Sequence, residues 1–160
     1  MQQYPWHAIR TKPHQEQIVA EGLRAKGYED FFPSYRSRRK WTDRIKFVDL
    51  PLFDGYVFVR FDPLKWVPIK STPGVLQIVW GHISEAEIEG VRRLAAGNLT
   101  ASPCPYLREG MTVRVRSGPL KGVSGVLDKV KNRYVLVLSV HLLQRSVQVE
   151  VDAESVEALT

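Results

Sequence analysis

The sequence has too few cysteines for a disulfide or for a cysteine-rich metal site. Its only cysteine is Cys104, and one thiol has no partner for an internal disulfide. This usage fits a reducing compartment, so we expect a cytoplasmic protein. The histidines are also few, and they lack the spacing of metal ligands; they are His7, His14, His82 and His141. We therefore expect no metal and no other cofactor.

Long apolar runs, targeting signals and catalytic motifs are missing as well. No stretch approaches the roughly 18 consecutive apolar residues that a membrane-spanning helix requires. Residues 1–7 lack the basic start and apolar run of a secretory signal peptide. The sequence contains neither a Gly-x-Ser-x-Gly element nor a phosphate-binding loop. We expect a protein that is not an enzyme and does not bind membranes.

Positive charge is what the chain has in excess, and one segment holds most of it. The net charge is +6, which favours a polyanionic partner. Residues 36–46 contain six basic side chains and one acidic side chain, Asp43. Without this segment, residues 1–95 would carry nine basic and ten acidic side chains. The basic residues of the segment and the tryptophan among them are Arg36, Arg38, Arg39, Lys40, Trp41, Arg44 and Lys46.

Residues 96–108 divide the chain into two regions with different patterns. This stretch combines two prolines, a glycine and small polar residues without periodicity, which is typical of a flexible linker. In the region before it, residues 4–10 and 56–61 have the content of strands, and residues 56–61 favour a strand buried on both faces. The region after it has short alternating segments at 112–116, 126–127, 134–140, 146–151 and 155–159. These segments predict five strands in a small closed barrel.

Amphipathic segments predict helices in the first region. Residues 13–26 place Ile18, Val19 and Leu23 on one expected face. Residues 62–68 suggest a short helix that begins at a proline and is ended by a second proline.

Residues 83–94 give the clearest helix signal. Ser84 and Glu87 have the spacing of a capping box, and Ile83 and Ile88 have the spacing of a hydrophobic staple. Strands and helices alternate irregularly within fewer than 100 residues, which predicts an α+β fold with helices packed on an antiparallel sheet.

The ordered set of segments in the first region resembles the N-terminal (NGN) domain of the NusG family. The matching segments are residues 6–11, 51–59 and 72–75 and the helix that opens at Ser84. The second region resembles a KOW domain, through residues 110–115, Gly118-Pro119 and Gly122. The resemblance implies an NGN domain at 1–95, with helices flanking an antiparallel sheet. It also implies a linker at 96–108 and an all-β, SH3-like KOW barrel at 109–160.

Two segments look most like the specialised UpxY-like and RfaH-like antiterminators of this family. They are residues 35–44 and 139–146. Housekeeping NusG typically has Phe-Phe-Pro-Gly-Tyr where this chain has Leu-Phe-Asp-Gly-Tyr at 52–56, so Asp54 places a carboxylate where a proline is usual. The resemblance implies a transcription elongation or antitermination factor that binds RNA polymerase, bridges its cleft and suppresses pausing or termination.

Residues 52–56 are the strongest candidate for a docking surface. Gly55 permits a close backbone approach, and its aromatic neighbours offer large rigid faces. By spacing alone these aromatic residues fit an ordinary core better. The family resemblance implies instead an apolar cavity that accepts the clamp helices of the polymerase β′ subunit. The residues implied are Trp6, Leu52, Phe53, Tyr56 and Phe58.

The resemblance also gives roles to the basic segment and to a nearby turn. The family places the basic side near upstream or non-template DNA, where arginines can contact phosphates and Trp41 can stack on an unpaired base. A solvated loop is the alternative for this segment. Lys70, Ser71 and Thr72 correspond to the region that touches the gate loop of the polymerase β subunit, and a plain turn fits them equally well.

The resemblance implies that the KOW region recruits the ribosome or the termination factor Rho. The candidate contacts are Leu142, Leu143, Gln144 and Arg145, for which a hairpin connection with core leucines is the alternative. Valine-rich residues 134–151 favour a stable barrel over a helical form. A ribosome-associated or RNA-binding KOW protein that does not act on polymerase is the alternative function. It is disfavoured because residues 96–160 carry only eight basic and six acidic side chains. We expect a monomer.

Overall fold

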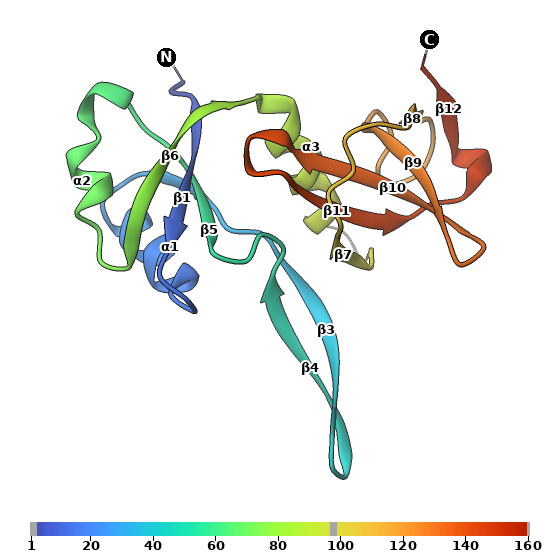
Figure 1. The fold of residues 1–160 in the computed structure, drawn as a ribbon, viewed down its shortest axis with the longest axis horizontal. Helices are drawn as coiled ribbons and strands as arrows, with labels where there is room; N and C mark the ends of the chain where they lie inside the picture. The colour runs from blue at the N-terminus through green and yellow to red at the C-terminus, as the bar shows by residue number, and fades with distance from the viewer. Residues whose placement is uncertain (1–2, 97–98, 160) are drawn as a thin grey trace.

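A computed structural model describes residues 3–96 and 99–159 (Figure 1). The N-terminal half is an α+β unit built on an antiparallel four-stranded sheet, in the order β2-β5-β1-β6, as the sequence predicts. A separate two-stranded hairpin extends from it. The elements of this half are β1 (Trp6–Thr11), α1 (Glu16–Ala25), β2 (Glu29–Phe31), β3 (Ser34–Trp41), β4 (Arg44–Pro51), β5 (Tyr56–Arg60), η1 (Pro63–Lys65), α2 (Val67–Lys70), β6 (Val75–Ile83) and α3 (Glu85–Ala96).

Strand β5 lies between two hydrophobic cores. Val57 and Val59 belong to the core that includes residues of α1 and α2. Phe58 points to the opposite face and belongs to a second core, which includes residues of α3 and of the C-terminal half. Because successive side chains of a strand alternate between the two faces of a sheet, these burials confirm the prediction of a strand buried on both sides.

The helices follow their local signals, with two corrections. Ser84 and Glu87 form the expected capping box: the Glu87 amide donates to Ser84 Oγ (3.1 Å) and the Ser84 amide donates to Glu87 Oε2 (2.8 Å). In α1, however, Ile18 is exposed, because the buried stripe runs through Val19, Ala20 and Leu23. Pro68 does not end a helix. It lies in the first turn of α2, where the missing N–H costs nothing.

The C-terminal half is an antiparallel six-stranded sheet in the order β12-β8-β9-β10-β11-β7. The five strands predicted from the sequence all form. The recorded pairings leave β12 and β7 at the two ends of the sheet. Closure into an SH3-like barrel therefore stays a prediction. The elements are β7 (Ala101–Cys104), β8 (Met111–Val115), β9 (Ser124–Val130), β10 (Arg133–Val140), η2 (His141–Leu143), β11 (Arg145–Glu150), η3 (Ala153–Ser155) and β12 (Val156–Ala158).

Part of the expected flexible linker is a strand. Residues 101–104 form β7, which pairs with β11 from Ala101 opposite Val149 to Cys104 opposite Ser146. Pro103 is tolerated because an edge strand does not need every N–H for pairing. Positions 97 and 98 of that linker lie outside the described residues.

Of the helices in the described part of the chain, none is long and apolar enough to span a membrane.

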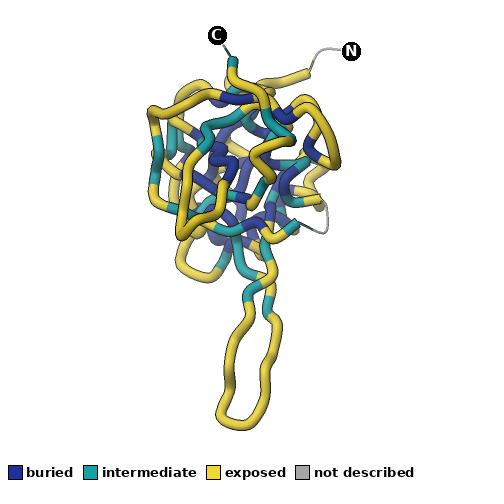
Figure 2. Tube along the Cα trace, turned by 90° about the vertical axis from the view of Figure 1, so that its right-hand side faces the viewer, coloured by how far each residue is buried: buried dark blue, intermediate teal, exposed yellow. Residues whose placement is uncertain are grey.

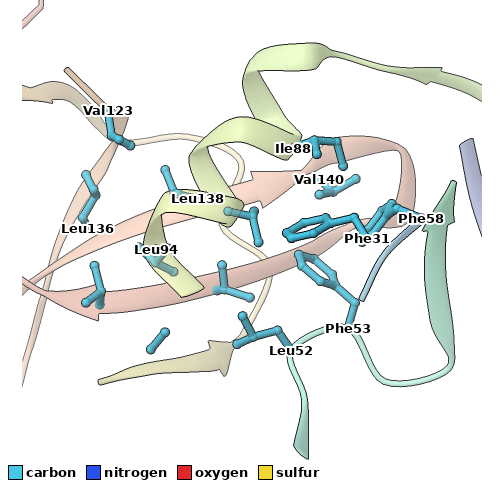
Figure 3. Close-up of a cluster of buried hydrophobic side chains, with 14 of the residues drawn as sticks. Phe31, Leu52, Phe53, Phe58, Ile88, Leu94, Val123, Leu136, Leu138 and Val140 are labelled. Atoms are coloured by element: carbon cyan, nitrogen blue, oxygen red, sulfur yellow. The ribbon is translucent and has the colours of Figure 1, made fainter. Parts of the chain in front are cut away.

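The two halves share one hydrophobic core. Ile88, Val91 and Leu94 on α3 are buried together with Leu136, Leu138 and Val140 of β10 and with the phenylalanines of the N-terminal sheet (Figure 3). Helix α3 therefore lies between the two sheets (Figure 1). We call this contact between the N-terminal and C-terminal halves the closed arrangement. The shared burial stabilises it, since removal of apolar area from water is the main stabilising contribution in such contacts.

Candidate functional site

The residues expected to form the docking surface gather at this shared core. Trp6, Leu52, Phe53 and Phe58 have exposed fractions of only 1%, 3%, 1% and 0%, and Tyr56 is half-buried against the same cluster. The Phe53 and Phe58 rings meet edge to face, with centroids 5.2 Å apart. The structure thus brings all five residues together, and it covers them with the rest of the chain.

Trp6 lies among arginines at one end of this cluster. The guanidinium carbon of Arg60 is 4.4 Å from the centre of the Trp6 ring, and that of Arg92 is 5.9 Å away. Burial opposes the charge of Arg60, but hydrogen bonds to Glu85 and Glu29 raise the pKa of Arg60 above its ordinary value. The indole Nε1 of Trp6 is buried without a hydrogen-bond partner among the described residues. A buried donor of this kind costs stability until a partner reaches it.

Polar contacts from α3 hold the two halves together beside the shared core. The backbone N–H of His141 donates to Glu87 Oε1 at 3.1 Å, so the capping-box glutamate also fixes the C-terminal half. The Arg93 guanidinium donates to the carbonyl oxygens of Lys121 and Pro119, at 2.6 and 2.8 Å. Charged hydrogen bonds are stronger than neutral ones, so both contacts favour the closed arrangement.

The KOW segment expected to contact an outside partner instead touches the N-terminal half. Leu142 packs against Gly81 of β6, where a Cβ atom would lie 2.5 Å from Leu142 Cδ1. The Arg145 guanidinium lies 5.5 Å from the ring centre of Tyr56. Leu143 is half-buried against the shared core, and Gln144 is exposed with a positive φ of 53°. In this arrangement the segment and the docking residues are parts of one interface.

The residues expected to reach the gate loop have different environments. Thr72 is 2% exposed, and its hydroxyl donates to the Pro68 carbonyl and accepts from Lys26 Nζ at 3.0 Å. It therefore supports the turn from inside. Lys70 and Ser71 remain exposed on the same turn, with the Lys70 ammonium donating to the Leu76 carbonyl at 2.7 Å.

The basic segment forms the projecting β-hairpin of strands β3 and β4 (Figures 1 and 2). None of the ion pairs recorded for residues 3–96 and 99–159 involves a basic side chain of this segment. Trp41 at its tip is 55% exposed. The solvated-loop alternative is therefore wrong in one respect: the segment is an ordered pair of strands, although its side chains are solvated.

Burial shifts the pKa values of two groups with reactive chemistry, Cys104 and His7. Burial, with a smaller contribution from Asp128, raises the pKa of the Cys104 thiol to about 11, so little of the nucleophilic thiolate exists at neutral pH. Burial also lowers the pKa of His7, with a hydrogen bond to the Pro5 carbonyl partly offsetting it. No cluster of three or more metal-ligating side chains occurs in the part of the chain that the structure describes.

A comparison with protein-family models identifies the family of this chain. The family model described as "Transcription termination factor nusG" matches residues 4–93, which is more than half of the chain. The chain belongs to the NusG family. This is a non-enzymatic family of transcription factors whose members interact with RNA polymerase. Membership of this family indicates a transcription elongation factor.

A solved structure of a NusG protein resembles the fold of this chain over nearly its whole length. The structure titled "Domain interaction in Thermotoga maritima NusG" has 22% sequence identity and a TM-score of 0.52, and the match covers 98% of this chain and 97% of that chain. At this identity the likeness concerns the fold alone. Two conformations of the MjSpt4:Spt5 complex match at 22% identity with TM-scores of 0.33 and 0.35, covering 97% of this chain and 98% and 97% of those chains. No curated protein sequence matches.

Several residues of this site were missed by reasoning from the sequence. Glu87 was expected only as a helix cap, yet it also joins the two halves. Arg93 and Gly81 carry no local signal for the contacts that they make, because these contacts are with residues far along the chain. Only the apolar spacing of α3 gave a hint that this helix has a face to bury.

Proposed function

We propose that this NusG-family chain is a specialised elongation and antitermination factor of the UpxY-like or RfaH-like kind. Its N-terminal half docks on the clamp helices of the polymerase β′ subunit and suppresses pausing or termination. The observation that carries this proposal is the gathering of five aromatic and aliphatic residues on one face of the N-terminal sheet. They are Trp6, Leu52, Phe53, Tyr56 and Phe58. Large aromatic residues at such a face commonly supply most of the binding energy of an interface.

Docking through this face requires the two halves to separate. In the closed arrangement the face shares its core with α3 and the C-terminal sheet, so a clamp helix has no access to it. A ligand that binds only the separated form shifts the equilibrium towards that form by its differential affinity. Polymerase therefore competes with the C-terminal half for the same residues, and the chain binds polymerase more weakly than a permanently open form would.

Separation also frees the proposed contact segment of the C-terminal half. Leu142, Leu143, Gln144 and Arg145 contact or adjoin the N-terminal half when closed. Once released, they are available to a second partner such as the ribosome or Rho. Polymerase docking and recruitment of the second partner are then coupled, because both use the open form. Tethering the two partners raises the effective concentration of each near the other.

Two further contacts complete the proposed binding to polymerase. Lys70 and Ser71 reach the gate loop of the β subunit, while buried Thr72 supports their turn. The hairpin β3–β4 carries an excess of positive charge without ion-pair partners in the described ranges, which suits upstream or non-template DNA. Its phosphate contacts make that binding weaken with salt.

Tyr56→Ala in the full-length chain tests the docking proposal. We expect its affinity for core RNA polymerase to fall about 10-fold or more, since a buried aromatic anchor is lost from the interface. Binding is measured by titrating polymerase against the fluorescently labelled chain. Arg145→Ala is the matched control, because it removes the same closed-state contact between Arg145 and Tyr56 and leaves the docking face intact. If Tyr56→Ala bound as tightly as Arg145→Ala, the docking assignment would be wrong.

A further inference from the structure

The two faces of the hairpin differ in what they carry. Because directly opposed residues of paired strands share a face, the register assigns each side chain. One face carries Arg39 opposite Lys46 and Trp41 opposite Arg44. The other face carries three cations in alternate positions of β3; they are Arg36, Arg38 and Lys40, and they lie opposite Asp49, Phe47 and Ile45. Successive cations on this second face are about 6.6–6.8 Å apart along the strand.

The second face leads into an open cleft at the root of the hairpin. The cleft has a volume of about 670 Å³. The hairpin wall supplies Arg36, Arg38, Phe47 and Asp49. The opposite wall is formed by the end of α3 and by residues 99–102, which include the start of β7. That opposite wall combines apolar side chains with hydroxyl groups; its members are Leu94, Ala95, Leu99, Thr100, Ala101 and Ser102.

The cleft combines the groups that a nucleotide needs. Phe47 is 56% exposed, and the Arg36 guanidinium lies over its ring, 5.7 Å from the ring centre, so an exposed aromatic ring and a cation lie together. Among the described residues Arg38 has no ion-pair partner and can bind a phosphate. Apolar side chains opposite Phe47 offer a second surface to a base. The volume lies within the range of about 300–1,000 Å³ typical of small-molecule sites.

We propose that this cleft binds a nucleotide of a single-stranded nucleic acid whose backbone follows Arg36, Arg38 and Lys40 along the hairpin. The inference rests on the proposed nucleic-acid role of the hairpin and concerns the chain before its halves separate, because β7 of the C-terminal sheet supplies part of the opposite wall. It adds where the strand lies and which form is bound. A duplex keeps its bases stacked inside and can offer only phosphates to the arginines. A single strand can place an unpaired base against Phe47 while its phosphates pair with the cations, and base stacking on aromatic side chains adds affinity at each such site.

The test measures fluorescence anisotropy of labelled oligonucleotides titrated with the full-length chain. The probes are a mixed-sequence single-stranded 12-mer as DNA, the same sequence as RNA, and the DNA duplex. We expect a single strand to bind about 10-fold more tightly than the duplex, and the tighter of the DNA and RNA probes identifies the strand used. An acidic peptide of equal charge serves as competitor and is expected to displace none of the three probes. Equal binding of duplex and single strands, or displacement by the peptide, contradicts the proposal.

Matched variants then distinguish binding in the cleft from general electrostatic attraction to the hairpin. Arg38→Ala is expected to weaken single-strand binding about 10-fold, whereas Arg39→Ala on the other face weakens it only about 2- to 3-fold. Ser102→Trp fills the cleft without changing the charge, and it is expected to weaken binding as much as Arg38→Ala does. If circular dichroism shows that Ser102→Trp does not fold, Thr100→Trp takes its place in this test.

The results distinguish the proposed role of the hairpin from the proposed role of the cleft. Failure of the wild-type chain to bind any nucleic acid contradicts the role of the hairpin itself. Binding that Arg38→Ala and Arg39→Ala weaken equally, and that the tryptophan variant leaves unchanged, contradicts the cleft alone and leaves the hairpin as a general electrostatic contact.

Discussion

Leu142→Asp is expected to raise the affinity of the full-length chain for core RNA polymerase about 10- to 100-fold, because it opens the interface between the two halves. Leu142 packs on Gly81 and against the shared core. A carboxylate there must either lose its hydration or leave the interface, and leaving is the less costly outcome. The apparent affinity of a partner that binds only the open form rises with the open fraction. Titration with polymerase measures the change.

Leu64→Asp is the control for this prediction. Leu64 is 90% exposed and lies in η1, away from the interface, so the same substitution there should leave polymerase affinity unchanged. Limited proteolysis at Leu99, which packs against the shared core in the closed arrangement, should also be faster in Leu142→Asp than in the control. Unchanged affinity of Leu142→Asp, together with faster proteolysis, would mean that the covered face is not the one polymerase uses.

Phe53→Ala is expected to lower the free energy of unfolding by about 3–5 kcal/mol, the cost of removing a fully buried phenylalanine from a packed core. Phe53 is 1% exposed and meets Phe58 edge to face. The cavity lies in the core that both halves share, so the loss should affect the whole chain. Urea unfolding followed by tryptophan fluorescence measures it.

Phe47→Ala provides the same chemical change at an exposed position. Phe47 lies on the hairpin with more than half of its surface exposed, and surface substitutions of this kind usually change stability by less than about 0.5 kcal/mol. A loss below about 1 kcal/mol for Phe53→Ala, close to that of Phe47→Ala, would contradict the burial of Phe53.

Local signals in the sequence predicted much of the fold because they act within a few residues. The capping box at Ser84, the buried strand at β5 and the alternating strands of the C-terminal half all depend on neighbours in the chain. The hairpin β3–β4 was missed because its cations hide the alternation of Ile45 and Phe47. Strand β6 was also missed, although Val75, Ile78, Val79 and Ile83 give it β-branched content.

Contacts between distant segments were the part that the sequence could not predict. Nothing near Glu87 or Arg93 indicates that they bind the backbone of residues 26 to 54 positions away. The pairing of β7 with β11 is equally non-local, and the linker-like composition around Pro103 argued against it. The aromatic segment at 52–56 fitted both a core and a docking face. In the closed arrangement Leu52 and Phe53 are core residues and Tyr56 is half-buried against the same cluster. A docking role therefore depends on a second arrangement of the halves, which composition and spacing do not encode.

A reversible cross-link between the halves tests directly whether polymerase docking requires them to separate. A Cβ atom at Gly90 on α3 would lie 3.9 Å from Val123 Cγ1 in the C-terminal half. Gly90→Cys with Val123→Cys, made in a Cys104→Ser background, is therefore placed to form a disulfide that locks the closed arrangement. We expect that the oxidised chain does not bind core RNA polymerase and that adding dithiothreitol restores binding. Equal binding by the oxidised and reduced chains would show that docking does not require separation.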